Sequence, residues 1–462
     1  MKLNSKILLI GGSGFLGNEI GIELVNAGYQ INLLTREIKE DGCLSYPATQ
    51  FCWESDGSVP ESAIKGVDAI VNLSGESISA GRWTAAKKRR IVESRINTTR
   101  SVVQAAKNHR IDTLIQTSAI GYYGDTGSSI ADESTPMGRG FLAETASQWE
   151  QQLKTLGNTR LVTMRLGVVL GTSGGALPEI LNPYALGFGG KIGNGKHFLS
   201  WIHVKDVCRF VIHAMENKEV TGIYNLTAPN PVSYEKLHEF FVSKFGGPRW
   251  LKIPSQIFKL VLGEKSQLLL MSQNVIPQNL VEIGFKFEFL NLEKCLEDLL
   301  GSDNSDCFIL DHKQWIPAST HQVWDFFSSE KNLEKLTPAF LKFRVDSMST
   351  ASIEENSLIS YRLKIHGLPV KWRSKIINYD PENSFQDIQL SGPYRTWNHT
   401  HRFMELGEGT LIQDFVKYKI PLGAIGGLFA NTFVKNDIEK IFQYRRKKVS
   451  DIFSKKEDHD EK

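Results

Sequence analysis

Short apolar runs alternate with longer segments of helical periodicity over the first 170 residues. The runs are rich in Ile, Leu and Val and end in glycine or polar residues: KILLIGG, QINLLTR, AIVNLSG, TLIQTSAIG and LVTMRLGVVLG. Between them, residues 16–27 and 83–108 have the length and apolar spacing of helices. Continuously apolar strands separated by helices predict a parallel sheet covered on both faces. The expected fold class is doubly wound α/β.

The next region is less regular. It is glycine-rich at 185–195, contains a further strand pattern, GIYNLT, and ends in the helical pattern NLEKCLEDLL. The polar segment GSDNSD at 301–306 then predicts a domain boundary. We expect a first domain over 1–300, with a small C-terminal module at about 249–300.

The pattern after residue 306 changes to successive strands. CFILDHKQWI comes first, a short helix is expected at 318–329, and five more strand patterns follow: SLISYRLKI, VKWRSKIINY, FQDIQLSG, THRFMEL and TLIQDFVKYKI. A long helix at about 427–453 closes the region. This order predicts a second domain of the α+β class over 306–455.

Composition agrees with two globular domains. The 462 residues are 41% hydrophobic and 23% charged, and the net charge of +3 gives no basic excess for nucleic acid. No run approaches the roughly 18 apolar residues of a membrane span. Five cysteines without CxxC spacing indicate reduced thiols and no zinc site, so we expect a cytoplasmic protein.

The segment GGSGFLG lies between the first strand and the first helix. Glycines here let backbone amides approach a pyrophosphate, and the helix N-terminus adds partial positive charge. We therefore expect a Rossmann-type dinucleotide site formed by Gly11, Gly12, Ser13, Gly14, Phe15, Leu16 and Gly17.

The second strand ends in Thr35 and Arg36, where an NAD-binding protein usually has an acidic residue for the ribose hydroxyls. An arginine offers a forked donor and a positive charge to a 2′-phosphate. This favours NADP(H) over NAD(H); the alternative is an exposed arginine with no ligand.

Residues 1–300 resemble the extended short-chain dehydrogenase/reductase superfamily, in its nucleoside-diphosphate-sugar-epimerase-like branch. The supporting strings are VNLSGESI, GRWTAAKKRRIVESRINTT, TSAIGYYG, RLGVVLG, SWIHVKDV and NVIPQNLVEIGFKF. The resemblance implies that Leu73 and Ser74 lie under the adenine and ribose side of the cofactor, that Arg95 lies near it, and that Ser118 orients the substrate. His203 and Asp206 match an element near the substrate cleft, and a structural role is favoured for both.

The sequence departs from the superfamily at its YxxxK motif, whose tyrosine acts as acid/base and whose lysine lowers the tyrosine pKa. The matching segment offers Phe141 with Thr145, or Leu142 with Ala146. Tyr122 and Tyr123 follow Ser118 closely and are the substitutes we consider; aromatic packing is their alternative role.

Residues 307–453 resemble the SRPBCC (START-like) superfamily, which implies a sheet curved around a long helix with an apolar ligand cavity. The match rests on FILDHKQWIPASTHQVWDFF, NLEKLTP, GLPVKWRSKI, DIQLSGPYRTWNHTHRF and VKYKIPLG. His399 and His401 alternate with Trp397 on one strand, so the three share a face. Two histidines could bind a metal, but no third ligand is evident nearby, so we expect a cavity-facing or strand-packing role and no metal.

The resulting hypothesis is an NADP(H)-dependent oxidoreductase or nucleoside-diphosphate-sugar epimerase fused to a hydrophobic small-molecule-binding domain. Its substrate would be a sugar nucleotide or a ketone. The missing YxxxK pair keeps a second class open, a non-catalytic NADP(H)-binding sensor or scaffold with a lipid-like ligand. The sequence leaves the oligomeric state open.

Overall fold

The computed structural model describes residues 5–40, 42–301, 308–420 and 423–454, except for some side chains within 330–331, 423–433 and 454. The chain forms two compact units. Unit 1 comprises 1–38, 48–179 and 189–302, and unit 2 comprises 39–47, 180–188 and 303–462. The boundary expected at 301–306 falls almost wholly outside the described residues. Among described helices, none is long and apolar enough to cross a membrane.

Unit 1 is built on a seven-stranded sheet with the order β11-β6-β5-β4-β1-β2-β3. All six neighbouring pairs are parallel. The predicted Rossmann-like parallel sheet is therefore confirmed. Its strands are β1 (Lys6–Ile10), β2 (Gln30–Thr35), β3 (Thr49–Cys52), β4 (Ala69–Asn72), β5 (Thr113–Ala119), β6 (Arg160–Leu166) and β11 (Gly222–Leu226).

Two details of this sheet differ from the sequence expectation. The short strand β3 was not predicted, because TQFC has neither an apolar run nor a full alternation. The apolar run that ends at Gly171 is two strands, β6 and β7 (Val168–Leu170), divided at Gly167. A Cβ on Gly167 would lie 2.8 Å from the Ser200 carbonyl oxygen, so the close approach of another backbone explains the break.

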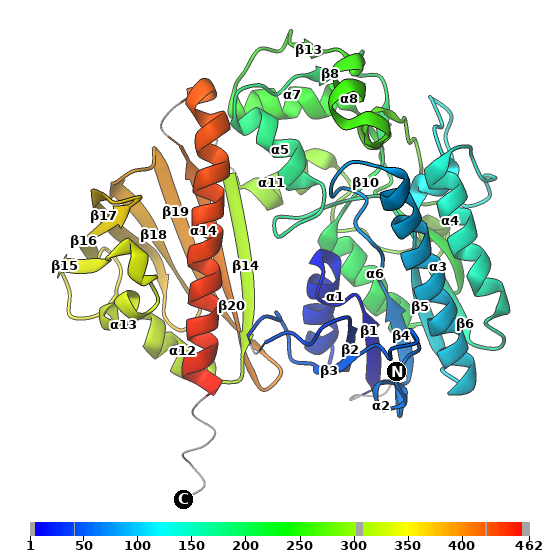
Figure 1. Ribbon diagram of the computed structural model, residues 1–462, viewed down its shortest axis with the longest axis horizontal. Coiled ribbons are helices and arrows are strands. Elements are labelled where there is room, and N and C mark those ends of the chain that lie inside the picture. The colour runs from blue at the N-terminus through cyan, green and yellow to red at the C-terminus, as the bar shows by residue number, and fades with distance from the viewer. Residues whose placement is uncertain (1–4, 41, 302–307, 421–422, 455–462) are drawn as a thin grey trace, which may run out of the picture. The chain divides into compact units, whose positions relative to one another are not determined.

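Helices cover both faces of the parallel sheet (Figure 1). On one face α1 (Phe15–Asn26) packs against α6 (Val204–Glu216), and on the other α3 (Ala85–Asn108) packs against α4 (Phe141–Gln151). Smaller elements complete the unit: α2 (Glu61–Ile64), η1 (Ile120–Tyr123), η2 (Gln152–Thr155), β8 (Lys191–Ile192), β9 (Phe198–Leu199), β10 (Trp201–His203), β12 (Val232–Ser233), α7 (Tyr234–Phe245), β13 (Lys252–Ile253), α8 (Ser255–Leu262), η3 (Gly263–Ser266), α9 (Gln267–Leu270), α10 (Gln278–Glu282) and α11 (Leu292–Leu300). The remaining helix, α5 (Leu177–Ala185), begins in unit 1 and ends in unit 2.

Unit 2 is a seven-stranded antiparallel sheet with the order β14-β20-β19-β18-β17-β16-β15. The long helix α14 (Gly423–Ser454), red in Figure 1, runs along the sheet. This confirms the predicted strand-rich α+β order. The other elements are β14 (Phe308–Ile316), α12 (Thr320–Phe327), α13 (Glu330–Lys335), η4 (Ala339–Leu341), β15 (Arg344–Met348), β16 (Leu358–Ile365), β17 (Leu368–Asp380), β18 (Ser384–Ser391), β19 (Thr396–Leu406) and β20 (Gly409–Lys419).

Residues 39–47 belong to unit 2 although they lie far from it in sequence. The Trp315 amide donates to the Leu44 carbonyl at 2.9 Å, and the Ser45 hydroxyl donates to the Lys313 carbonyl at 3.2 Å. Leu44 and Tyr46 are buried. The sequence pattern did not predict that residues 39–47 join unit 2, because this placement depends on contacts between residues more than 260 positions apart in the chain.

Candidate cofactor and active site

The glycine turn between β1 and α1 fits a bound dinucleotide. Gly11 has a φ of +80°, and a Cβ there would lie 3.0 Å from the backbone of both Leu73 and Ser74. A Cβ on Gly17 would lie 2.4 Å from the Gly11 carbonyl oxygen. Any side chain at these two positions would therefore force the backbone apart.

The N-terminus of α1 opens from this turn without a side-chain cap. Its N-cap residue is Gly14, and both Ser13 and Gly14 are exposed. The first amides of a helix need an external acceptor, and the helix dipole favours an anion there. The next residue, Phe15, packs its ring so closely against Gly171 and Gly175 that a Cβ on either would lie within 2.8 Å of it.

The ends of β2 and β4 lie beside the glycine turn, because β1 pairs with both strands. After β2, the Thr35 hydroxyl donates to the Glu37 carbonyl at 3.0 Å, and Arg36 is exposed. After β4, the Ser74 hydroxyl donates to the Asn72 side chain at 2.6 Å. The structure thus brings together the predicted glycine turn, the predicted 2′-phosphate residue and the predicted loop 73–74 at the carboxyl ends of three neighbouring parallel strands.

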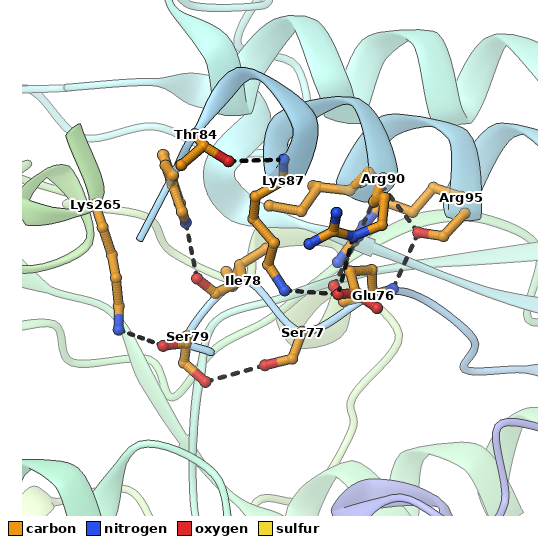
Figure 2. A network of polar contacts seen from close by, with 12 residues as sticks. Glu76, Ser77, Ile78, Ser79, Thr84, Lys87, Arg90, Arg95 and Lys265 are labelled. Atoms are coloured by element: carbon orange, nitrogen blue, oxygen red, sulfur yellow. Dashed lines mark hydrogen bonds and ion pairs between the residues drawn. The ribbon is translucent and has the colours of Figure 1, made fainter. Parts of the chain in front are cut away.

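A polar network follows β4 and adds cations that the sequence analysis did not single out (Figure 2). The Lys87 ammonium lies 2.6 Å from the Glu76 carboxylate, and Arg90 Nε lies 3.9 Å from it. The pKa of Glu76 is lowered because Lys87 donates a hydrogen bond to it, and the charges of Lys87, Arg90 and Arg36 add to the effect. Three cations thus surround one carboxylate. The run KKRR at 87–90 was the available sequence signal.

Arg95, on α3, contacts the loop after β4 (Figure 2). Its Nη1 donates to the Glu76 and Ile91 carbonyls, both at 3.0 Å, and its guanidinium lies 5.1 Å from the Trp149 ring centroid. Burial lowers the pKa of Arg95 to about 10. These contacts give Arg95 a role in positioning the loop, with its side chain already engaged by the protein.

The C-terminal module is tied to the same loop. The Lys265 ammonium donates to the Ser79 carbonyl, Lys88 lies 2.6 Å from Glu264, and Arg82 donates to the Val261 carbonyl at 2.9 Å. These bonds connect α8 and η3 to the segment between β4 and α3 and to the first turn of α3. The module therefore helps to fix the loop that borders the cofactor turn.

Ser118 lies on β5 with its hydroxyl engaged. It donates to the Glu150 carboxylate at 2.6 Å, and Arg165 binds the same carboxylate through both Nε and Nη2, at 2.9 and 2.8 Å. Ser118 and Arg165 are both buried. Glu150 and Arg165 were not singled out from the sequence, since they come from α4 and β6, and no short motif links them to Ser118.

The two candidate tyrosines differ in their surroundings. The Tyr123 hydroxyl is buried, donates to Asn225 at 2.8 Å and accepts from Arg165 at 2.8 Å. Burial raises the pKa of Tyr123 to about 12, although Arg165 opposes the change. Tyr122 is only half-buried, with the Arg165 guanidinium 3.6 Å from its ring centroid. Tyr122 is therefore the more accessible phenol after β5.

The residues at the YxxxK position form the start of α4 and pack inside the fold. The Phe141 ring lies 5.3 Å from that of Trp83, and Lys88 lies 5.0 Å from the Phe141 centroid. The buried Thr145 hydroxyl donates to the Phe141 carbonyl at 2.6 Å. This pair supplies neither a phenol nor an ammonium group.

His203 and Asp206 fasten the C-terminal module to the α6 region. His203 Nδ1 accepts from the Lys205 amide at 3.0 Å, and its ring stacks on Phe289 at 3.9 Å. The Asp206 carboxylate accepts from the Glu288 and Phe289 amides at 2.8 and 3.1 Å. These contacts support the structural role that the sequence analysis favoured.

In unit 2, His399 and His401 meet a third potential metal ligand, Asp414, which the sequence analysis did not identify. His399 Nε2 lies 3.0 Å and His401 Nδ1 2.8 Å from the same carboxylate oxygen. Asp414 comes from the neighbouring strand β20, where it pairs with His401. A partner thirteen residues away along the chain becomes visible only once the strand register is known.

Comparisons with known proteins find similarity over the N-terminal three hundred residues. Residues 7–227 match the NAD dependent epimerase/dehydratase family, and residues 253–299 match a domain of unknown function, DUF1731. The epimerase family protein YfhF of Bacillus subtilis is 36% identical over 300 residues, which cover 64% of this chain and 97% of that protein. An Arabidopsis thaliana homologue of epimerase family protein SDR39U1, described as chloroplastic, is 33% identical over 64% of this chain and 86% of its own length.

Two solved structures are also similar. Human epimerase family protein SDR39U1, crystallised with NADPH, is 29% identical, with a TM-score of 0.58 over 64% of this chain and 99% of that chain. A nucleoside-diphosphate sugar epimerase from Corynebacterium glutamicum is 26% identical, with a TM-score of 0.53 over 65% of this chain and 59% of that one. Through its N-terminal three hundred residues, the chain belongs to the NAD-dependent epimerase/dehydratase family.

Proposed function

We propose that residues 1–300 bind NADP(H) and use it in hydride transfer to or from a small-molecule substrate. The main support is the glycine turn, which we call the cradle, where neither Gly11 nor Gly17 has room for a side chain. The exposed Arg36 lies at the end of the neighbouring strand β2. A bound dinucleotide would supply the hydride donor or acceptor. The cradle would hold its pyrophosphate, and Arg36 with the nearby Lys87 and Arg90 would favour the extra phosphate of NADP(H). The NADPH bound to human SDR39U1 supports the same choice.

The cofactor preference can be tested with one charge reversal. We expect the wild-type chain to bind NADPH several-fold tighter than NADH, and Arg36→Glu to erase that preference because a carboxylate repels the 2′-phosphate. Arg100→Glu, an equal charge change at another exposed position, is the matched control and should keep the preference. Equal affinities of the wild-type chain for the two cofactors, measured by calorimetry, would contradict the assignment.

A sugar nucleotide or a ketone is the proposed substrate class. The name of the Corynebacterium glutamicum relative supports the first. Ser118, Tyr122 and Tyr123 remain the proposed catalytic residues, and the accessibility of Tyr122 makes it the favoured acid/base. We also propose that the protein works in the cytoplasm, because its five cysteines have no CxxC spacing and no pattern of a disulfide framework.

A second candidate function is a non-catalytic NADP(H)-dependent sensor. The specific observation in its favour is the packing of Phe141 and Thr145 where the superfamily has its tyrosine and lysine. Incubation with NADPH and a panel of sugar nucleotides and ketones separates the two functions. Turnover with any member supports the enzyme, whereas tight NADPH binding without turnover supports the sensor.

For unit 2 we propose an SRPBCC-like fold that binds an apolar small molecule. Its sheet and α14 enclose a cavity of about 870 Å³, within the range of small-molecule sites. The lining is mainly aromatic and aliphatic, which suits an apolar ligand. The binding of a neutral apolar fluorophore to the full chain tests this part of the proposal.

A further inference from the structure

The cavity of unit 2 has an apolar body and a polar region. The body is lined by aromatic and aliphatic side chains, among them Phe340, Tyr361, Trp372, Tyr394, Trp397 and Ile441. The polar region is lined by Asp387, His399, His401 and Arg445. The apolar body favours an apolar ligand, and the polar region determines which polar group that ligand can carry.

Strand register explains how the polar groups converge. Asp387 on β18 pairs with His399 on β19, and His401, two residues further along the same face, pairs with Asp414 on β20. From α14, Arg445 reaches the row and lies 3.3 Å from the Asp414 carboxylate. Three neighbouring strands and the long helix therefore build one polar row.

Two atoms of this row have no hydrogen-bond partner within the described part of the chain. They are Oδ1 of Asp387 and Nε of Arg445, and both are buried. The rest of each side chain is occupied, because Ser374 hydrogen-bonds to the Asp387 carboxyl and Arg445 Nη2 faces Asp414. A buried polar atom without a partner costs free energy, and here both atoms belong to residues that line a cavity.

The cation of this row is already paired with an anion. The Arg445 cation lies against the Asp414 anion, whose pKa is held well below its usual value by Arg445 and both histidines despite its burial. Burial lowers the pKa of His401 to about 3, so its ring is neutral at pH 7. Arg445 also places a permanent positive charge beside the His399–His401–Asp414 cluster, which disfavours a divalent metal there. No unpaired cation of this row remains to recruit an ionised carboxylate ligand.

We propose that this cavity binds an uncharged, largely apolar molecule through a single hydroxyl group, which donates to Asp387 and accepts from Arg445. A hydroxyl is both donor and acceptor, so one group satisfies both unpartnered atoms. This inference rests on the proposed apolar-ligand function of unit 2 and adds the chemistry that selects the ligand.

Pyrene derivatives provide a matched set of probes. 1-Pyrenebutanol carries the hydroxyl, 1-butylpyrene lacks it, and 1-pyrenebutyrate replaces it with an anion. Energy transfer from tryptophan to pyrene reports binding in the full chain, because Trp372 and Trp397 line the cavity. We expect the alcohol to bind roughly tenfold tighter than the hydrocarbon, although the hydrocarbon is the more apolar of the two, because only the alcohol satisfies the buried groups.

Two variants remove the hydroxyl partners separately. Asp387→Leu removes the acceptor, and Arg445→Lys keeps the charge that pairs with Asp414 but removes the Nε–H donor. Each should bring the alcohol-to-hydrocarbon ratio close to one. Asp437→Leu and Lys440→Arg change a lining carboxylate and a lining cation outside the polar row, and they should leave the ratio unchanged.

The outcomes distinguish a failure of the hydroxyl anchor from a failure of the apolar-ligand function of unit 2. If neither alcohol nor hydrocarbon binds the wild-type chain, the apolar-ligand function fails and this inference fails with it. If both bind equally well, or if the variants keep the alcohol preference, the hydroxyl anchor is wrong while the apolar site stands. Tightest binding of 1-pyrenebutyrate would overturn the assignment to an uncharged ligand.

Discussion

At the scale of single residues, the active-site candidates are distinguished by what their polar atoms already bind. The Ser118 hydroxyl is held by Glu150, and the Tyr123 hydroxyl is held between Arg165 and Asn225. Tyr122 touches the same arginine only through its ring. A proton-transferring group must reach the substrate, and this favours Tyr122.

The catalytic assignment predicts a pattern among three variants. In single-turnover NADPH oxidation, Tyr122→Phe should lower the rate by about one to three orders of magnitude with little change in NADPH affinity. Ser118→Ala should also lower it, because Glu150 loses a hydrogen bond beside the reacting region. Tyr123→Phe should act mainly on stability. Unchanged rates in all three would remove these residues from the mechanism and favour the sensor.

The buried His203 predicts a dependence of stability on pH. Burial lowers its pKa from 6.5 to about 4 in the folded chain, so between those values the unfolded chain binds more protons. The free energy of unfolding should therefore fall as the pH drops from 6.5 to 4, by up to about 3 kcal/mol from this residue.

The His203→Asn variant isolates this contribution. Asparagine can still accept from the Lys205 amide as a helix cap, but it does not titrate. Urea unfolding measured from pH 7 to pH 4 should give a shallower loss for the variant than for the wild-type chain. Equal slopes would show that His203 titrates normally in the folded state.

At the scale of elements, the cofactor turn depends on how closely α1 approaches the end of β1. Gly17 has no room for a side chain, whereas a Cβ on Gly14 would meet its nearest atom at 3.4 Å, and the backbone there is ordinary. The two glycines therefore serve different purposes. Gly17 permits the packing of the helix, and Gly14 leaves the helix N-terminus open to a ligand.

Alanine substitutions should separate these purposes. Gly17→Ala should lower the free energy of unfolding by about 1–3 kcal/mol and weaken NADPH binding, because backbone atoms must move. Gly14→Ala should leave stability nearly unchanged but still weaken NADPH binding by crowding the phosphates. Thermal melts and calorimetry on both variants provide the test. A stable Gly17→Ala variant with full affinity would contradict the close approach.

At the scale of the whole molecule, the chain does not divide at one point. Residues 39–47 belong to unit 2, yet they follow Arg36 by only a few positions. Removing residues 303–462 would take away the β14 groups that hydrogen-bond to Leu44 and Ser45. A large core cluster of unit 1 is formed by its own sheet and helices and contains none of those residues.

A chain ending at residue 301 should therefore fold and bind NADPH, with one altered segment. We expect limited proteolysis to cut it within 39–47 and to spare that segment in the full chain. Calorimetry should still detect NADPH binding. An insoluble product, or one that does not bind NADPH, would contradict the independence of unit 1.

The sequence alone determined the elements whose pattern is local. Alternating apolar strands and helices predicted the parallel sheet, and glycine spacing predicted the cofactor turn, because both depend on neighbours within a few residues. The sequence also located Arg36 at the end of β2 and showed the absence of the YxxxK pair. The short strands β3 and β15, with little apolar periodicity, escaped detection.

Only the tertiary structure decided which distant groups meet. Glu150 and Arg165 reach Ser118 from two other elements, Asp414 reaches His401 through strand register, and residues 39–47 join a unit far along the chain. These arrangements depend on packing between segments separated by 13 to more than 260 residues. Burial then sets the charge state of groups such as His203 and His401, and that burial exists only in the folded chain.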